Sequence, residues 1–167
     1  MRRILFSFIF LFLFTGTAFS LTVGVVDLQR ALNECEAGKV AVRNLKETAE
    51  VKKKIIERKK AELAKLREEL SKKMKESERS KKEALYETKA KELQNFIERA
   101  QGEISHKSDE YQSNILKGLV DTVNKIAKKE KIDVVIEVHG GIVYFNPRMD
   151  LTDKLIKAYN ESTRKKK

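Results

Sequence analysis

The 167-residue chain contains no tryptophan, one proline and one cysteine, and only seven of its residues are glycine. A lone cysteine excludes an intramolecular disulfide, so a disulfide framework cannot take the place of a packed core. Residues that interrupt helices are scarce, whereas lysine, glutamate and leucine are abundant, which is typical of long helices. Cys35 shares one helical face with Leu28, Ala31 and Leu32, which predicts a buried thiol; the alternative is a redox-active or intermolecular one.

Positive charge is concentrated in two parts of the chain. Lys and Arg total 36 against 25 Asp and Glu, a net charge of +11. The stretch from Lys52 to Glu83 holds 14 basic and 7 acidic residues, and the last four residues, Arg164 to Lys167, are all basic. Such a balance favours acidic partners, and nucleic acid is the first class to consider. The alternative for most single lysines is a solvated helix face without a partner.

Residues 1–20 have the order of a secretory signal peptide. Two arginines precede an apolar run from Ile4 to Phe14, and Ala18 and Ser20 place small residues at the −3 and −1 positions of a cleavage site. The run is too short to cross a bilayer comfortably; an uncleaved N-terminal anchor is the alternative. We predict cleavage near Ser20 and export to the periplasm, which argues against binding of nucleic acid. Anionic lipid or lipopolysaccharide surfaces and acidic polypeptides then fit the basic charge better.

Residues 39–130 are predicted to form a helical hairpin arm. The stretch lacks proline, and from Tyr86 to Ile104 its apolar residues recur at the heptad spacing of a coiled coil. A single straight helix of this length needs a partner along its whole extent. Folding back at residues 75–80, which hold no large apolar side chain, supplies that partner from within the chain. Gly102 and Gly118 lie inside the second helix, either as bending points or as close-packing points.

The two ends of the exported chain are predicted to form a small β body. Residues 21–38 are expected to form a strand and a short helix, residues 131–160 a β-hairpin and a helix, and residues 161–167 a basic tail. Three short strands leave two open sheet edges, so we expect several copies to join their strands into one closed barrel. The predicted fold class is α+β, mostly α, with a body completed by oligomerisation. The residues expected at the contacts between copies are Val23, Val25, Val134, Ile136, Val138, Ile142 and Tyr144.

Both ends of the chain resemble the Skp (OmpH-like) family of periplasmic chaperones. The segment from Val23 to Leu32 is similar to the family's opening strand and helix, and the segments 133–144 and 150–156 are similar to its closing hairpin and helix. The resemblance implies a homotrimer in which a small β-barrel carries three helical hairpin arms around a cavity. It also implies that the protein holds unfolded outer-membrane proteins in the periplasm without ATP.

Two kinds of residue on the arm are candidates for client binding. Lysines would steer acidic clients toward the arm, and apolar residues in excess of the helical seam would retain them. The alternative for the apolar residues is that they fill the hairpin interface. The candidates are Lys52, Lys53, Lys54, Ile55, Lys59, Lys60, Met74, Leu85 and Phe96. If the arms hold no clients, the alternative function is a structural or tethering coiled-coil protein of the cell envelope.

No motif for catalysis or cofactor binding is apparent in the sequence. The Gly38-Lys39 pair lacks the earlier glycine and the following hydroxyl residue of a phosphate loop. His106 and His139 are far apart, and neither lies near a cysteine or a patterned carboxylate in the sequence, so no metal site is expected. We predict a protein that is not an enzyme and needs no cofactor.

Overall fold

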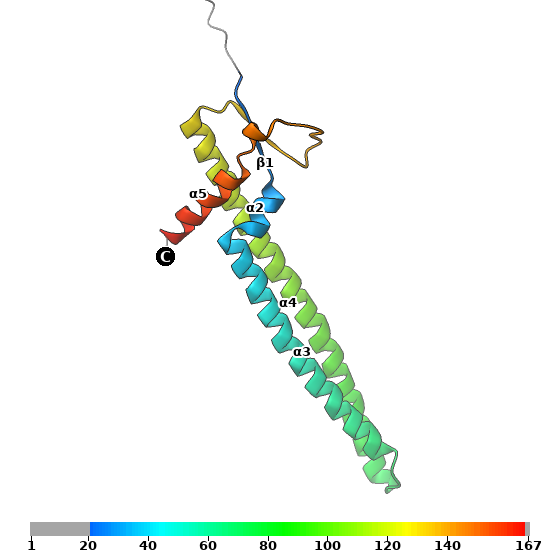
Figure 1. Cartoon of the computed structure of the whole chain (residues 1–167). Helices are drawn as coiled ribbons and strands as arrows, with labels where there is room; N and C mark the ends of the chain where they lie inside the picture. Colours follow the sequence, from blue (N-terminus) through cyan, green and yellow to red (C-terminus); the bar gives the residue numbers. More distant parts are fainter. Residues whose placement is uncertain (1–20, 166–167) are drawn as a thin grey trace, which may run out of the picture.

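The computed structural model describes residues 21–165, so the predicted signal peptide and the last two lysines of the tail lie outside the described residues. This part of the chain forms a long arm of two antiparallel helices and a small body in which both ends of the chain meet (Figure 1). The predicted α+β, mostly α fold with a long helical hairpin is confirmed.

Between residues 21 and 165, no helix combines the length and the apolar character that crossing a membrane requires.

The arm consists of α3 (Glu36–Leu70) and α4 (Glu76–Glu130), joined by a short connection at the tip. The predicted fold-back at residues 75–80 is about one helical turn too late. The helix α3 ends where the hydroxyl of Ser71 donates a hydrogen bond to the Glu68 carbonyl at 2.7 Å. The segment expected to turn is instead the start of α4, because two of its glutamates lie in the first turn and complement the positive end of the helix dipole.

Ion pairs between the two helices mark the register of the arm. The three pairs nearest the tip are Lys59–Glu92, Glu62–Lys89 and Glu69–Lys82. Along α3 these paired residues advance by three and then seven positions, and their partners on α4 move back by three and then seven positions. Two antiparallel helices in constant register require this match. Exposed pairs of this kind contribute little stability individually. Their repetition at matched steps favours one alignment of the helices over others.

The outer part of the arm has no buried core. Among the described residues of the two long helices, buried ones occur only between residues 38 and 41 of α3 and between residues 100 and 126 of α4. Seam residues farther out, such as Leu66, Leu93 and Ile97, are only partly buried. A single arm therefore leaves apolar surface in contact with solvent along much of its length.

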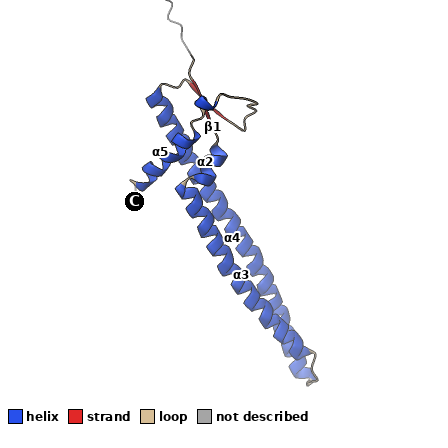
Figure 2. Cartoon of the chain, viewed as in Figure 1, coloured by secondary structure: helices blue, strands red, loops and turns tan. Residues whose placement is uncertain are grey.

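The body is built on a two-stranded parallel sheet (Figure 2). Its elements are β1 (Val23–Val26), α2 (Leu28–Glu34), β2 (Val134–Glu137), the 3-10 helix η2 (Pro147–Met149) and α5 (Thr152–Arg164). In the sheet, Val25 of β1 lies opposite Ile136 of β2, and an isolated bridge links Val25 to Asp150. The first strand therefore has chain on both of its sides, whereas one side of β2 has no strand beside it in the described chain.

The predicted β-hairpin is wrong. Residues 142–145 form no strand, and after a turn at residues 138–141 the chain continues as a loop that projects from the body (Figure 1). The strand β2 pairs in parallel with β1 instead, because the whole arm acts as the helical crossover between them. We call residues 142–146 the projecting segment; within it, Val143 is 101% and Tyr144 82% exposed.

The core lies where α2, α4 and α5 meet. Leu119 of α4 and Leu155 of α5 are completely buried, and so is Cys35, which confirms the predicted buried thiol. Cys35 also forms the break between α2 and α3. There its Sγ accepts a hydrogen bond from the Gly38 N–H at 3.3 Å, which caps the start of α3.

The two glycines inside α4 occupy different environments. A Cβ added to Gly118 would lie 2.6 Å from the ring of Tyr159, so this glycine allows α4 and α5 to approach closely. A Cβ added to Gly102 would meet nothing within 4 Å. Of the two roles expected from the sequence, close packing therefore applies to Gly118 and has no support at Gly102.

We expect Gly118→Ala to lower the free energy of unfolding by about 1–3 kcal/mol, because the added methyl group overlaps the Tyr159 ring. Gly102→Ala is the matched control on the same helix. It should raise the free energy of unfolding by about 0.5–1 kcal/mol, because alanine is the better helix former and its methyl group meets open space. Urea unfolding followed by circular dichroism measures both. Equal effects of the two substitutions would contradict the packing described for Gly118.

Candidate functional site

The lysines predicted to bind clients divide into two groups on the arm. The ammonium of Lys52 lies 2.7 Å from a carboxylate oxygen of Glu103 across the hairpin, and 5.7 Å from the centroid of the Phe96 ring. Lys59 also pairs across the hairpin, as described above. These two lysines therefore hold the two helices together, and their charges are largely compensated.

The remaining basic candidates face solvent. Lys60 pairs with Glu57 on its own helix at 3.1 Å. Lys53 and Lys54 are exposed and have no acidic partner among the described residues. Of the five lysine candidates, Lys53 and Lys54 are therefore the two whose charge is available to a partner.

Three glutamates in cross-hairpin pairs, Glu62, Glu69 and Glu103, have lowered pKa values. The hydrogen bond from Lys52, with a second from Lys107, lowers the pKa of Glu103 below its ordinary value. Hydrogen bonds from Lys89 and Lys82 lower the pKa values of Glu62 and Glu69 in the same way. The charged form of each glutamate is thus the one that the folded arm favours.

The apolar candidates are spread along the arm instead of forming one site. Ile55, Met74 and Phe96 are partly buried, with Met74 in the connection at the tip, and Leu85 is 44% exposed. Two valines that sequence reasoning missed, Val42 and Val51, are more exposed than any of these. Val51 stands between Glu50 and Lys52, and Val42 follows Val40 and Ala41; neither belongs to the periodic seam from which the candidates were chosen.

Large apolar side chains are also exposed on the body around β2. Val134 and Ile136 of this strand are 41% and 40% exposed, and Leu116 and Val120 of α4 are exposed to a similar degree. Beside the strand lies a shallow groove lined mainly by apolar side chains, namely Leu28, Val120, Val123, Ile132 and Val135. The outer side of β2 therefore presents both unpaired backbone and apolar surface.

The residues predicted to contact other copies differ in their exposure in the single chain, and of these only Val134 and Ile136 are exposed residues of β2. Val25 is 1% exposed in the single chain, so its side chain cannot touch a second copy. Tyr144 lies in the projecting segment and is open to solvent. Val23, Val138 and Ile142 are partly buried.

A family model for "Outer membrane protein (OmpH-like)" matches residues 22–159, which include the strand and helix at the start of the body, the whole arm and most of α5. The chain belongs to the OmpH-like family. The resemblance found in the sequence is thereby confirmed. The sequence matches none of the curated proteins with which it was compared.

The OmpH-like fold is also found in a solved crystal structure. That structure is of a protein from Caulobacter crescentus assigned as an outer membrane chaperone (OmpH-like). The two chains superpose with a TM-score of 0.79 over 90% of this chain and 91% of that chain, at 19% sequence identity. At this identity the likeness establishes a common fold.

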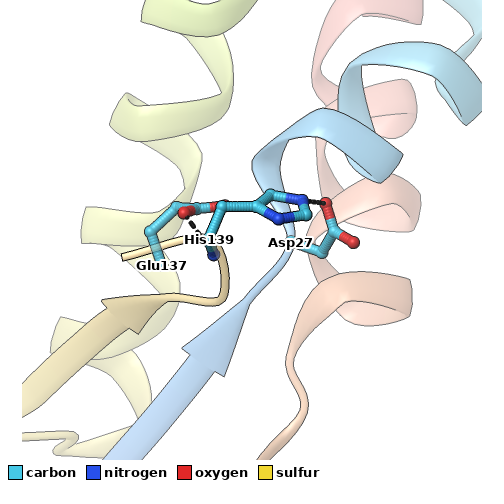
Figure 3. A group of neighbouring side chains, drawn as sticks. All are labelled: Asp27, Glu137 and His139. Atoms are coloured by element: carbon cyan, nitrogen blue, oxygen red, sulfur yellow. Dashed lines mark hydrogen bonds and ion pairs between the residues drawn. The ribbon is translucent and has the colours of Figure 1, made fainter. Parts of the chain in front are cut away.

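One further cluster in this OmpH-like chain lies at the ends of the two strands. Asp27, Glu137 and His139 come together there (Figure 3), and each offers a potential metal-ligand atom within 4.8 Å of the others. The expectation of no metal site considered neighbours along the sequence alone, whereas the strand pairing brings two carboxylates to His139. The sequence signal that was missed is positional, because Asp27 and Glu137 stand at the carboxyl ends of two strands that pair in parallel.

The lowered pKa values of the arm glutamates predict an acid-sensitive arm. A glutamate with a depressed pKa in the folded state contributes stability above its unfolded pKa, and this contribution is lost as the pH falls through the folded value. Thermal unfolding followed by circular dichroism should therefore show the melting temperature falling from about pH 4.5 downward, near the ordinary glutamate pKa.

The triple variant E62Q/E69Q/E103Q is the test of that cause. Its melting temperature at pH 7 should be lower than that of the unsubstituted protein, and its decline with acid shallower. An acid response as steep as that of the unsubstituted protein would assign the effect to other carboxylates. Raising the salt concentration should reduce the difference between the two proteins at pH 7, because exposed ion pairs are screened.

Proposed function

We propose that the protein is an ATP-independent holdase chaperone of the periplasm that binds unfolded outer-membrane proteins between helical arms. Family membership supports a role of this kind, and the neighbour from Caulobacter crescentus carries the description of an outer membrane chaperone. The observation that carries the proposal is the outer arm itself. It displays partly buried apolar residues and uncompensated lysines without a closed core of its own. Many weak contacts of this type suit clients that have no fixed shape.

A cavity between arms requires more than one copy of the chain, and we propose that three copies associate through their bodies. A two-stranded sheet is marginally stable by itself, and the free side of β2 exposes unpaired N–H and C=O groups. The projecting segment carries two of the most exposed large apolar side chains of the described chain. In the proposed assembly, the projecting segment of one copy lies against β2 and the apolar groove of the next copy.

An aggregation assay tests the holdase function. An unfolded β-barrel membrane protein is diluted from denaturant with and without this protein, and no nucleotide is added. The proposal expects light scattering to fall as the chaperone approaches stoichiometric amounts. A tethering coiled-coil protein, which is the second candidate, would leave aggregation of the denatured client unchanged.

Steering by uncompensated charge predicts different effects for two pairs of lysines. K53Q/K54Q should slow association with an acidic client by about threefold at low salt and reduce the salt dependence of the rate, with little change in stability. The matched pair K52Q/K59Q should instead lower the melting temperature, because it removes bonds across the hairpin. Stopped-flow fluorescence with a labelled client measures the rates. Unchanged rates and salt dependence in K53Q/K54Q would rule out steering by these two residues.

Association through the body predicts that the double variant V143S/Y144S shifts sedimentation equilibrium toward the monomer, because burial of two large apolar side chains is lost. We expect the association constant to fall at least about tenfold, which corresponds to about 1.4 kcal/mol. Leu85→Ser, which removes an exposed apolar residue from the arm, is the control and should leave the mass unchanged. A monomeric mass for the unsubstituted protein at micromolar concentration would defeat the assembly proposal.

A further inference from the structure

The carboxyl ends of β1 and β2 bring together three potential metal ligands from segments far apart in the sequence. Asp27 follows β1 directly, Glu137 is the last residue of β2, and His139 lies in the turn that follows. Because the strands are parallel, both carboxyl ends lie at the same edge of the sheet. There the Nε2 atom of His139 lies 3.5 Å from an Oδ1 atom of Asp27 (Figure 3).

One oxygen of each carboxylate is held by a backbone hydrogen bond, and in Asp27 this is also the oxygen that faces the His139 imidazole. The Oδ1 atom of Asp27 accepts a hydrogen bond from the Arg30 N–H at 2.7 Å, which caps α2. The Oε2 atom of Glu137 accepts one from the His139 N–H, also at 2.7 Å. Secondary contacts of this kind orient the ligands of metal sites. Here they fix two carboxylates on either side of one imidazole.

The charge at this edge of the sheet is opposite to that of the chain as a whole. Among residues 21–165, neither Asp27 nor Glu137 pairs with a lysine or arginine, although the net charge of the chain is +11. The nearest basic residue in sequence, Arg30, is directed to Glu34, Asp150 and Asp153 instead. Two carboxylates without a lysine or arginine partner, beside an imidazole, make a site whose negative charge a divalent cation would neutralise.

We propose that Asp27, Glu137 and His139 bind a divalent transition-metal ion of the Zn²⁺ class. One imidazole nitrogen and one oxygen from each carboxylate would serve as ligands, and water would complete the coordination sphere. This combination of nitrogen and oxygen ligands suits Zn²⁺ and its neighbours, whereas Mg²⁺ and Ca²⁺ prefer oxygen alone.

The geometry needs only a local adjustment to accept the ion. Ligands at about 2.0–2.1 Å from a tetrahedral zinc ion lie about 3.3 Å apart, and the three ligand atoms lie within 4.8 Å of one another, so no pair must approach by more than about 1.5 Å. The side chain of His139 is 63% exposed and lies in a turn, so it is free to make that movement. A bound ion would fasten the turn at residues 138–141, and with it the root of the projecting segment, to the start of α2.

Isothermal titration calorimetry with Zn²⁺ tests the proposal on purified protein that carries no polyhistidine tag. The expected result is saturable binding of one ion per chain. His139→Ala should weaken binding at least about tenfold, and so should Glu137→Gln. Asp27→Asn should do the same while preserving the cap of α2, because asparagine caps helices as well as aspartate does.

His106→Ala is the matched control, because it removes the only other histidine of the chain, which lies exposed on α4. It should leave zinc binding unchanged. Circular dichroism of each variant checks that the fold is retained. Loss of binding in the His106 variant, retention in the His139 variant, or equal binding of Mg²⁺ would each overturn the site. The absence of a saturable signal at millimolar Zn²⁺ would do so as well.

Discussion

The parallel pairing of β1 with β2 is the contact on which the rest of the structure depends. It closes a loop of more than one hundred residues, which would be entropically costly for a flexible chain. The hairpin of α3 and α4 lowers this cost, because two stiff antiparallel helices return the chain to its starting point. Once the strands are paired, α2 and α5 pack against the inner end of α4, and the core around Leu119 and Leu155 forms. The arm thus brings the two strands together, and the body forms around their contact.

Charge has two separate functions along the arm. Lysines whose partners lie on the opposite helix fix how the helices align, and those without partners remain available to other molecules. Two helices alone do not bury the apolar seam fully. The seam residues pack against each other across the hairpin and also leave apolar surface exposed to solvent. Ion pairs between the helices fix the alignment of such an arm, and the core of the body fixes its base. Apolar side chains along the rest of the arm stay partly exposed.

Local sequence patterns predicted most helices and two of the three expected strands, but not how distant elements meet. Heptad spacing identified the second helix of the arm, and the run from Leu28 to Cys35 identified a buried thiol. Alternation in Val134–Glu137 identified a strand, but such a pattern does not say which strand it pairs with, so a hairpin was expected where a parallel pair exists. The roles of Lys52 and Lys59 depend on the register between two helices. The cluster of Asp27, Glu137 and His139 depends on the strand pairing itself. Residue spacing along one segment therefore predicts neither the roles of the two lysines nor the cluster.

The matched steps of the ion pairs in the arm constrain how its length can change. Removing seven residues from α3 alone would move each pair on the body side of the deletion two helical turns out of register with its partner on α4, whereas removing seven from each helix, at equal distances from the tip, would leave every remaining pair intact. The arm can therefore be shortened or extended only by paired insertions or deletions of whole heptads. The reach of this molecule is thus variable in discrete increments of about 10 Å, at 1.5 Å per residue, with the body left untouched.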